Sequence, residues 1–197
     1  MPEILQLSGG EASGYVEDLA RLRIQVFREY PYLYNGDMAY EVAYVDTFLQ
    51  AQQNFMVVVK DGDNVVGAST GLPLVEETDN IKAPFLEAGW DITKIFYFGE
   101  SVLLPEYRGK GYGKQFLELR EAFARSHGFS SLTFCAVVRP DDHPMRPEGY
   151  QPLDPLWRAQ GFQPEDLHCL ISWQEVGEAA ESAKTLQFWT KPIYTDD

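Results

Sequence analysis

The chain has 197 residues, of which 45% are hydrophobic; this is enough for one good core, and we expect a single domain over residues 1–197. Its formal net charge of −14 argues against a nucleic-acid partner, because phosphate contacts need an extended cationic face. The first residues lack a basic and apolar leader, and no apolar run approaches the ~18 residues of a membrane span. We therefore expect a cytoplasmic protein with no membrane partner.

Hydrophobic periodicity in the first half of the chain predicts a mixed α/β order of elements. A DGDN turn between two β-rich runs is a strong hairpin signal, and Pro31 ends the first helix. The expected elements are a strand at 3–8, helices at 15–30 and 39–53, hairpin strands at 55–60 and 65–74, and a short helix at 80–88.

Three tyrosines, Tyr30, Tyr32 and Tyr34, lie in the segment YPYLYNGD between the first two helices. Aromatic rings with polar tips suit a partly wet pocket, and their faces can bind a cation. For any one ring, the alternative is a tyrosine-rich loop packed over the core. As a group, the three are candidate substrate-binding residues.

The most informative segment joins a strand to a helix in the middle of the chain. The apolar run KIFYFGESVLL at 94–104 is followed by PEY and by RGKGYG at 108–113, after which helical spacing extends from 114 to 129. Glycines at a helix N-terminus permit positive φ and let a ligand approach backbone N–H groups, where the helix dipole favours negative charge. The segment predicts a bound anion, with phosphate as the first candidate. A glycine-rich turn beside a solvated basic helix face is the alternative.

Two common phosphate loops do not fit this segment. A P-loop needs GxxxxGK followed by Ser or Thr, but Lys110 is followed by Gly111. A dinucleotide fingerprint needs GxGxxG, and the last glycine, Gly113, has the wrong spacing. The pattern RxxGxG, formed by Arg108, Gly111 and Gly113, does fit. Preceded by LLPEY, it resembles the acetyl-CoA-binding motif of the GCN5-related N-acetyltransferase (GNAT) superfamily.

The resemblance continues after the motif, where a β-rich run at 130–138 is similar to the fifth strand of the superfamily and LWRAQGF at 156–162 is similar to its segment ending in GF. It implies the α/β acyl-CoA N-acyltransferase fold, with a mixed, mostly antiparallel twisted central sheet of about seven strands flanked by helices. It also implies acetyl-CoA as the co-substrate. The cofactor-binding residues that it implies are Val102, Leu103, Leu104, Arg108, Gly109, Lys110, Gly111, Tyr112, Gly113 and Lys114.

Acetyl transfer to an amine needs a group that accepts the amine proton and donors for the developing oxyanion. Glu100 is the candidate general base, because the superfamily often carries an acidic residue near this position of the strand. Strand alternation predicts that Glu100 faces the same side as Phe98 and Val102. An edge carboxylate capped by backbone N–H groups is the alternative.

The proton for the departing thiolate needs a separate source. The tyrosine that the superfamily usually carries before GF is replaced by Trp157, and an indole N–H is not an acid at neutral pH. Tyr150 is the candidate substitute, and a water molecule is the alternative.

A connection at 139–155 holds five prolines and few apolar residues. A long loop of this kind either shapes a functional pocket or serves as a rigid spacer. In the first case His143, Arg146 and Tyr150 would be its working residues. The full set of candidate substrate-binding residues is Tyr30, Tyr32, Tyr34, His143 and Trp157.

The two cysteines, Cys135 and Cys169, have no metal-like spacing with the three histidines, so neither a metal site nor a disulfide framework is expected.

Together these features predict an N-acetyltransferase that moves an acetyl group from acetyl-CoA to the amine of a small molecule by direct attack. The acceptor, a small amine or an amino-acid-like molecule, stays open, as does the choice between monomer and homodimer. A non-catalytic acyl-CoA-binding sensor or scaffold is the alternative from another class, motivated by Trp157. Peptide or protein N-acetylation ranks lower, because it needs an open groove and the proline-rich loop is expected to act as a lid.

Overall fold

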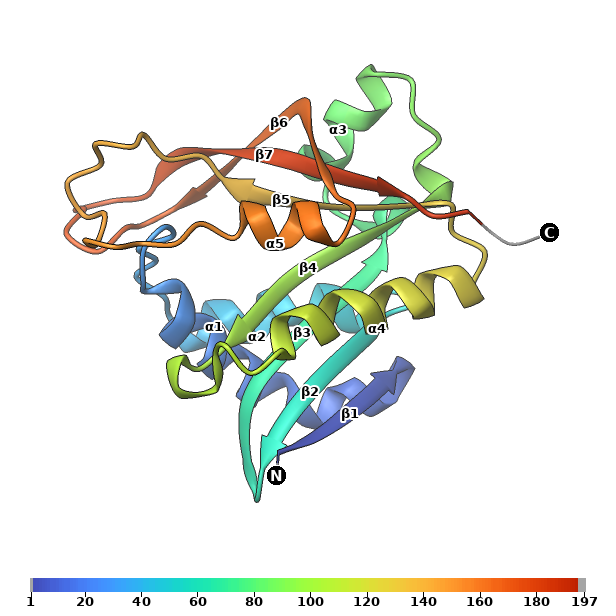
Figure 1. The fold of residues 1–197 in the computed structure, drawn as a ribbon, viewed down its shortest axis with the longest axis horizontal. Coiled ribbons are helices and arrows are strands. Elements are labelled where there is room, and N and C mark those ends of the chain that lie inside the picture. The colour runs from blue at the N-terminus through green and yellow to red at the C-terminus, as the bar shows by residue number, and fades with distance from the viewer. Residues whose placement is uncertain (1, 195–197) are drawn as a thin grey trace.

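The structure, a computed structural model, describes residues 2–194 and is built around one seven-stranded sheet (Figure 1). The strand order is β1-β2-β3-β4-β5-β7-β6, and all neighbouring strands are antiparallel except β4 and β5. The strands are β1 (Glu3–Ser8), β2 (Phe55–Asp61), β3 (Asn64–Pro73), β4 (Ile95–Leu103), β5 (Ser131–Val137), β6 (Gln163–Trp173) and β7 (Ser182–Pro192). This confirms the mixed, mostly antiparallel sheet that the sequence predicts.

Helices cover both faces of this sheet, with α1 and α2 on one face and α4 on the other (Figure 1). The helices are α1 (Val16–Phe27), α2 (Met38–Gln50), α3 (Asp79–Glu87), α4 (Tyr112–Ser126) and α5 (Asp154–Ala159). Within residues 2–194, no helix has both the length and the apolar character needed to cross a membrane.

The predicted elements are present, but several of their ends are shifted. α1 ends at Phe27 rather than at residue 30, because the residue before Pro31 is biased away from helical geometry. α4 begins at Tyr112, two residues before the predicted start, since Gly111 takes the left-handed conformation that precedes the helix. The sequence predicts about seven strands without assigning β6 and β7 individually.

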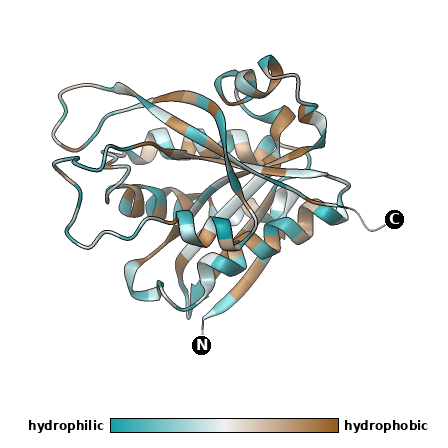
Figure 2. Cartoon of the chain, turned by 45° about the horizontal axis from the view of Figure 1, so that its top comes forward, coloured by the Kyte–Doolittle hydropathy of each residue, from teal (hydrophilic) through white to brown (hydrophobic). Residues whose placement is uncertain are grey.

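Two hydrophobic clusters fill the space between the sheet and its helices. Along β2, Met56 and Val58 pack in the cluster that contains α1 and α2 residues, whereas Phe55, Val57 and Val59 pack in the cluster that contains α4 residues. Successive residues of a strand point to opposite faces, so the run FMVVV supplies both cores. Figure 2 shows hydrophobic residues along the central strands, while the long loops at one end of the sheet are mostly hydrophilic.

The centre of β4 carries a β-bulge. The register with β3 shifts so that Gly99 and Glu100 of β4 lie opposite Thr70 alone. A Cβ atom on Gly99 would lie 2.5 Å from Oγ1 of Thr70, so glycine is needed for this close approach. A bulge bends its strand and redirects the side chains on one side of it.

The bulge changes which face Glu100 occupies. Phe98 packs in the α4 cluster, whereas Val102 packs in the cluster of α1 and α2. The prediction that Phe98, Glu100 and Val102 share one face is therefore wrong, because the extra residue reverses the alternation. Glu100 faces α1, on the side of Val102, where it pairs with Arg23.

β4 and β5 separate halfway along the sheet. They pair only where Ile95–Tyr97 lies beside Ser131–Thr133, and beyond these residues the strands diverge (Figure 1). The edge of β4 after the bulge therefore faces an opening rather than a neighbouring strand.

Candidate active site

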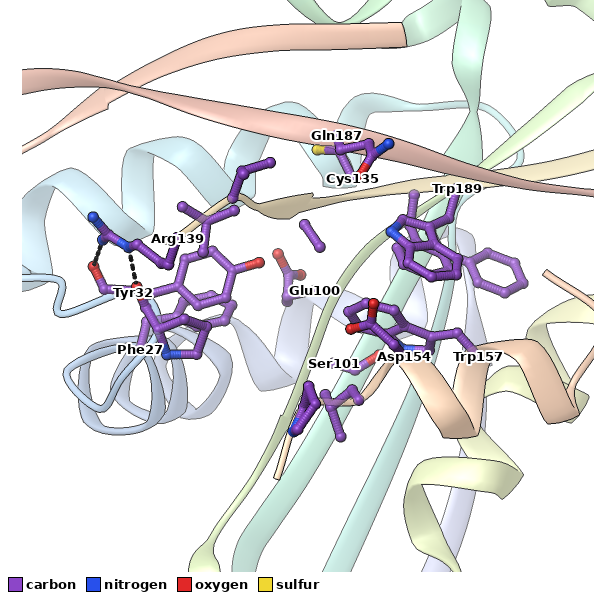
Figure 3. A pocket seen from close by; sticks show the side chains of 18 of the residues that line it. Phe27, Tyr32, Glu100, Ser101, Cys135, Arg139, Asp154, Trp157, Gln187 and Trp189 are labelled. Atoms are coloured by element: carbon purple, nitrogen blue, oxygen red, sulfur yellow. Dashed lines mark hydrogen bonds between the residues drawn. The ribbon is translucent and has the colours of Figure 1, made fainter. Parts of the chain in front are cut away.

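A cavity of about 430 Å³ occupies the space between the diverging strands. Its walls come from Phe98–Ser101 of β4, Phe134–Val137 of β5, the segment after α1 and the loop that precedes α5. Figure 3 shows Glu100 and Ser101 on one side of this space, with Trp157, Gln187 and Trp189 across from them. Its volume suits a small organic ligand.

The turn between β4 and α4 forms a cradle of backbone N–H groups, contributed by residues 109–114. Within residues 2–194, none of these N–H groups donates to a protein acceptor, and the first bond of the helix is from Gln115 N–H to the Gly111 carbonyl, 3.1 Å. Gly109 and Gly111 have φ values of 73° and 89°. A Cβ on Gly109 would meet no atom within 4 Å, so the space in front of the turn is open. Free N–H groups at a helix N-terminus bind anions such as phosphate.

The basic side chains of the cradle have protein partners. Arg108 donates from Nη1 to the Glu29 carboxylate at 2.7 Å and from Nε to the Leu103 carbonyl at 3.1 Å. Lys114 pairs with Glu118 at 3.4 Å, with more than half of the lysine side chain exposed. Among the described residues, the groups that the cradle leaves free for an anion are therefore its backbone N–H groups, while Arg108 ties the turn to the edge of β4.

The structure distinguishes the three strand residues predicted to hold the cofactor arm. The Leu104 N–H donates to the Val66 carbonyl of β3 at 3.0 Å, so it points away from the opening. Because N–H groups alternate along an antiparallel strand, the N–H of Leu103 points to the opening and that of Val102 to β3. Of the three, Leu103 presents its backbone N–H to a ligand that enters between β4 and β5, since its carbonyl accepts from Arg108.

Glu100 lines the cavity and is 7% exposed. Its Oε1 accepts a hydrogen bond from the Thr70 hydroxyl at 2.6 Å, and its Oε2 pairs with the Arg23 guanidinium. Arg23 also pairs with Glu41, which is fully buried. A cap of backbone N–H groups does not describe this carboxylate, because a guanidinium and a hydroxyl hold it in place.

The Arg23 side chain keeps its charge in this buried setting. Burial lowers the pKa of Arg23, but the carboxylates of Glu100 and Glu41 raise it further, so that the net pKa lies above the ordinary value for arginine. One guanidinium is thereby shared between two carboxylates.

Arg120 of α4 holds the bulge from the opposite face. Its Nη1 donates to the carbonyls of Thr70 and Glu100 at 2.9 and 3.3 Å, and its Nη2 donates to the Ser101 hydroxyl at 2.7 Å. The side chain is 1% exposed, and burial lowers the pKa of Arg120 to about 9, so it remains charged at neutral pH. Arg120 therefore fixes the backbone of the bulge rather than belonging to a solvated basic helix face.

Two loops that are far apart in sequence meet over the cavity. Tyr30 and Tyr150 both line it, and their rings contact edge to face at a centroid distance of 4.8 Å. Tyr32 lines the same wall and packs on Phe27 at 4.7 Å. Burial raises the pKa of Tyr150 above its ordinary value, with a further increase from Tyr30.

The other two predicted residues of these loops, Tyr34 and His143, are not part of the cavity wall. Tyr34 forms a backbone bridge with Glu175, and burial together with the Glu41 carboxylate raises its pKa. His143 packs against Tyr30 at a ring distance of 5.6 Å. A single residue step along an irregular loop decides which side chains face inward, and the sequence carries no signal for it.

Arg139 anchors the long loop at its start. Its Nε donates to the Pro31 carbonyl at 2.7 Å and its Nη2 donates to the Tyr32 carbonyl at 3.2 Å (Figure 3). Arg139 also pairs with Glu175. The tyrosine segment and the proline-rich loop are thereby fixed to each other. Nothing in the sequence around the first residue of this loop predicts these contacts, because their partners lie at least 36 residues away.

Trp157 stands in an aromatic wall. Its ring lies 4.9 Å from that of Phe134 and 5.0 Å from that of Trp189, and all three side chains line the cavity. Asp154, one turn before Trp157, points its carboxylate into the same space (Figure 3). Within residues 2–194 it has no ion-pair partner and donates to or accepts from no side chain. The Asp-Pro pair that starts α5 is a helix-start signal that would have marked this position.

A mixed sheet that opens between a parallel pair of strands, with an anion cradle at the start of the next helix, defines the acyl-CoA N-acyltransferase fold. Residues 19–148 match the acetyltransferase (GNAT) family, and the chain belongs to this family. The matched range includes the bulge, the cradle and β5. It ends inside the proline-rich loop, so α5, β6 and β7 lie beyond it.

Solved structures share the fold at low sequence identity. The chain superposes on ribosomal-protein-alanine N-acetyltransferase from Brucella melitensis with a TM-score of 0.62 and 15% identity, over 96% of this chain and 99% of that one. An acetyltransferase from Thermus thermophilus superposes with a TM-score of 0.58 and 13% identity, over 98% of this chain and 97% of that one. The protein yncA from Salmonella typhimurium, solved with its cofactor acetyl-CoA, superposes with a TM-score of 0.58 and 12% identity, over 98% of this chain and 95% of that one. No curated protein matches the chain in sequence.

Proposed function

We propose that the chain, as one domain over residues 1–197, is an N-acetyltransferase that transfers the acetyl group of acetyl-CoA to the amine of a small molecule. The observation that carries this proposal is the cavity, which lies between the open edge of β4 and an aromatic wall and contains Glu100. Family membership supports acyl transfer, and the volume of the cavity supports a small acceptor.

The donor end fits acetyl-CoA. The N–H groups of residues 109–114 would hold the pyrophosphate, and the exposed Lys110 and Lys114 would neutralise further phosphate charge. The Leu103 backbone would hydrogen-bond the pantetheine arm. When bound, acetyl-CoA supplies an acetyl group activated as a thioester.

The acceptor end would carry out the transfer. The amine nitrogen forms a bond to the acetyl carbon while the carbon–sulfur bond breaks, which yields an amide and the thiol of CoA. The proton that the amine loses passes to Glu100, directly or through a water molecule. Arg23 and Thr70 orient the Glu100 carboxylate for this step, since each holds one of its oxygens.

Tyr150 would return a proton to the departing thiolate. Its raised pKa keeps the phenol protonated at neutral pH, as a proton donor must be, and its side chain lines the cavity. Trp157 belongs to the aromatic wall instead, where its packing against Phe134 and Trp189 supports a role in shaping the site.

A peptide acceptor would need an open groove. The contact between Tyr30 and Tyr150 and the three bonds of Arg139 close one side of the cavity, which favours a small molecule. The non-catalytic sensor remains the alternative, because the tyrosine expected at position 157 is a tryptophan.

The proposal is tested by incubating purified protein with acetyl-CoA and a library of small amines. Mass spectrometry detects products that are about 42 Da heavier, because acetylation replaces one hydrogen atom by an acetyl group. Calorimetry measures CoA binding separately. Turnover with one amine class, together with CoA binding, is the expected result. Binding without turnover of any amine would support the sensor, and absence of CoA binding would contradict both.

A further inference from the structure

Among the described residues of the cavity wall, every charged side chain except one has a protein partner. Arg139 pairs with Glu175, Arg146 pairs with Asp141 at 2.8 Å, and Glu100 shares Arg23 with Glu41. Arg120 is bonded to carbonyl and hydroxyl oxygens at the bulge.

Asp154 is the exception among the described residues of the wall. No arginine, lysine or histidine of residues 2–194 lies within ion-pair distance of its carboxylate. Burial raises the pKa of Tyr150, and the nearby Asp154 carboxylate adds to this increase. A half-buried carboxylate that faces a cavity without a cation is costly to desolvate unless a ligand supplies the cation.

The aromatic rings of the wall suit a cation as well, and two of them already bind one: Arg146 lies over Tyr150 at 5.4 Å and Arg158 over Trp189 at 5.2 Å. The rings of Tyr30, Tyr32 and Tyr150 stand on one side of the cavity, and those of Trp157 and Trp189 on another. Aromatic faces attract ammonium groups, most strongly where water is excluded. Carboxylate and rings together provide both the charge and the apolar surface that an organic ammonium ion prefers.

We propose that Asp154 determines acceptor specificity by binding the ammonium group of a primary amine that carries no carboxylate. This inference depends on the proposed acetyl transfer for its acceptor role. Free amino acids are expected to be poor acceptors, because their carboxylate lies beside the ammonium group and would be repelled by the Asp154 carboxylate, while Arg139 is already paired with the half-buried Glu175. Asp154 is a specificity-determining residue here: it binds the ammonium form, which releases one proton to Glu100 or to water and so becomes the neutral amine that attacks.

Matched pairs of amines test the proposal: 2-phenylethylamine against phenylalanine, and 1,5-diaminopentane against lysine. Each pair differs by one carboxylate. The wild-type chain is expected to acetylate the amine of each pair with a kcat/KM at least about tenfold higher than that for the amino acid, the discrimination that one charged contact provides. Equal use of both members, or preference for the amino acid, would overturn the proposal.

Variants at position 154 separate specificity from structure. Asp154→Asn keeps the shape and removes the charge, and it is expected to raise KM for 2-phenylethylamine about tenfold while kcat and CoA affinity stay within about threefold. Asp154→Glu should restore most of the affinity. Glu148→Gln is the matched control, since Glu148 is an exposed acid of the same loop outside the cavity wall. Thermal melting of all variants confirms that they are folded.

Three results would contradict the inference: an unchanged KM in Asp154→Asn, a loss of CoA affinity in place of amine affinity, or an equal effect in Glu148→Gln. If the wild-type chain acetylates none of the four compounds, calorimetry of 2-phenylethylamine binding to the CoA complex decides whether the cation site exists. Binding that is lost in Asp154→Asn supports the cation site even though the proposed transfer fails, and no binding to wild type rejects the site.

Discussion

The cradle between β4 and α4, which is the proposed donor end, and the cavity, which is the proposed acceptor end, are built in different ways. The donor end is a continuous stretch from β4 to α4 that uses backbone N–H groups, and its shape depends on the positive φ of Gly109 and Gly111. The acceptor end consists of side chains from segments far apart: Arg23 and Glu100 are separated by 77 residues, and Arg139 and Pro31 by 108. Backbone chemistry is encoded locally, whereas side-chain networks depend on the completed fold.

This difference has an energetic counterpart. The ion pair of Arg108 at the donor end has both side chains 43% exposed. The pairs of Arg23 at the acceptor end are nearly excluded from water, with the Arg23 side chain 12% exposed. Exposed pairs contribute little to stability, but breaking a buried pair leaves a charge without a partner. We therefore expect substitutions at the acceptor end to affect folding and chemistry together.

The largest expected effect is on catalysis, in Glu100→Gln. Loss of a general base should lower kcat by ~10²- to 10⁴-fold, with CoA affinity unchanged because the donor end does not use this side chain. The measurement is kcat at saturating acetyl-CoA across about pH 6–9, with calorimetry for CoA.

Glu41→Gln is the matched control for Glu100→Gln. It removes the other carboxylate from Arg23 but does not touch the cavity wall. If both variants lose the same fraction of activity, the role of Glu100 is to hold Arg23, and the assignment of a base fails.

The second prediction compares one arginine from each end. Arg23→Met leaves the Glu41 and Glu100 carboxylates without their shared guanidinium, and we expect the free energy of unfolding to fall by about 3–5 kcal/mol. Arg108→Gln removes the exposed pair with Glu29 and should cost about 0–1 kcal/mol. Urea unfolding of both variants checks the contrast. Equal losses would mean that the two ends are not stabilised differently.

The third prediction concerns the cradle. Gly111→Val forces a β-branched residue to φ 89°, at a cost of about 1–3 kcal/mol, and places a methyl group where the phosphates would lie. CoA affinity should fall by more than about tenfold, as measured by calorimetry on the folded variant.

Gly177→Val separates backbone strain from ligand contact. Gly177 has φ 93° and open space around its Cβ position, but it lies between β6 and β7, outside the cavity wall. This control should lose comparable stability and keep its CoA affinity. A similar loss of affinity in both variants would count against the position of the cradle.

The comparison also explains what could be predicted from sequence. RxxGxG and the helix after it are local, so the position of the cradle follows from adjacent residues. The sequence predicts Glu100 as a site residue on the side of Val102, but placing Phe98 on the same side is wrong, because a bulge at Gly99 adds one residue to the alternation. The bonds between Arg23 and Glu41 involve residues whose sequence context predicts an ordinary amphipathic helix.

The loops mark the limit of prediction most clearly. The sequence groups Tyr30, Tyr32 and Tyr34 as candidate substrate-binding residues. In the structure the first two line the cavity wall, whereas Tyr34 forms a backbone β-bridge with Glu175. Regular elements fix side-chain direction by their period, but a loop has no period. Asp154 was missed for a related reason, since its importance depends on which other charges already have partners.

The smallest expected effect is that of Tyr150→Phe. A thiolate is a good leaving group, so loss of the proton donor should lower kcat by only about tenfold, below the usual range for general acids. Burial and Tyr30 raise the pKa of Tyr150 above its ordinary value of 10.0, and a raised pKa keeps the phenol protonated throughout the range below that value. The ratio of wild-type to variant kcat should therefore be constant from about pH 6 to 9.

Tyr30→Phe is the matched control, because it keeps the ring contact and should retain full activity. A ratio that decreases toward one within this range would assign the proton to another group, and full activity in Tyr150→Phe would leave this step to water.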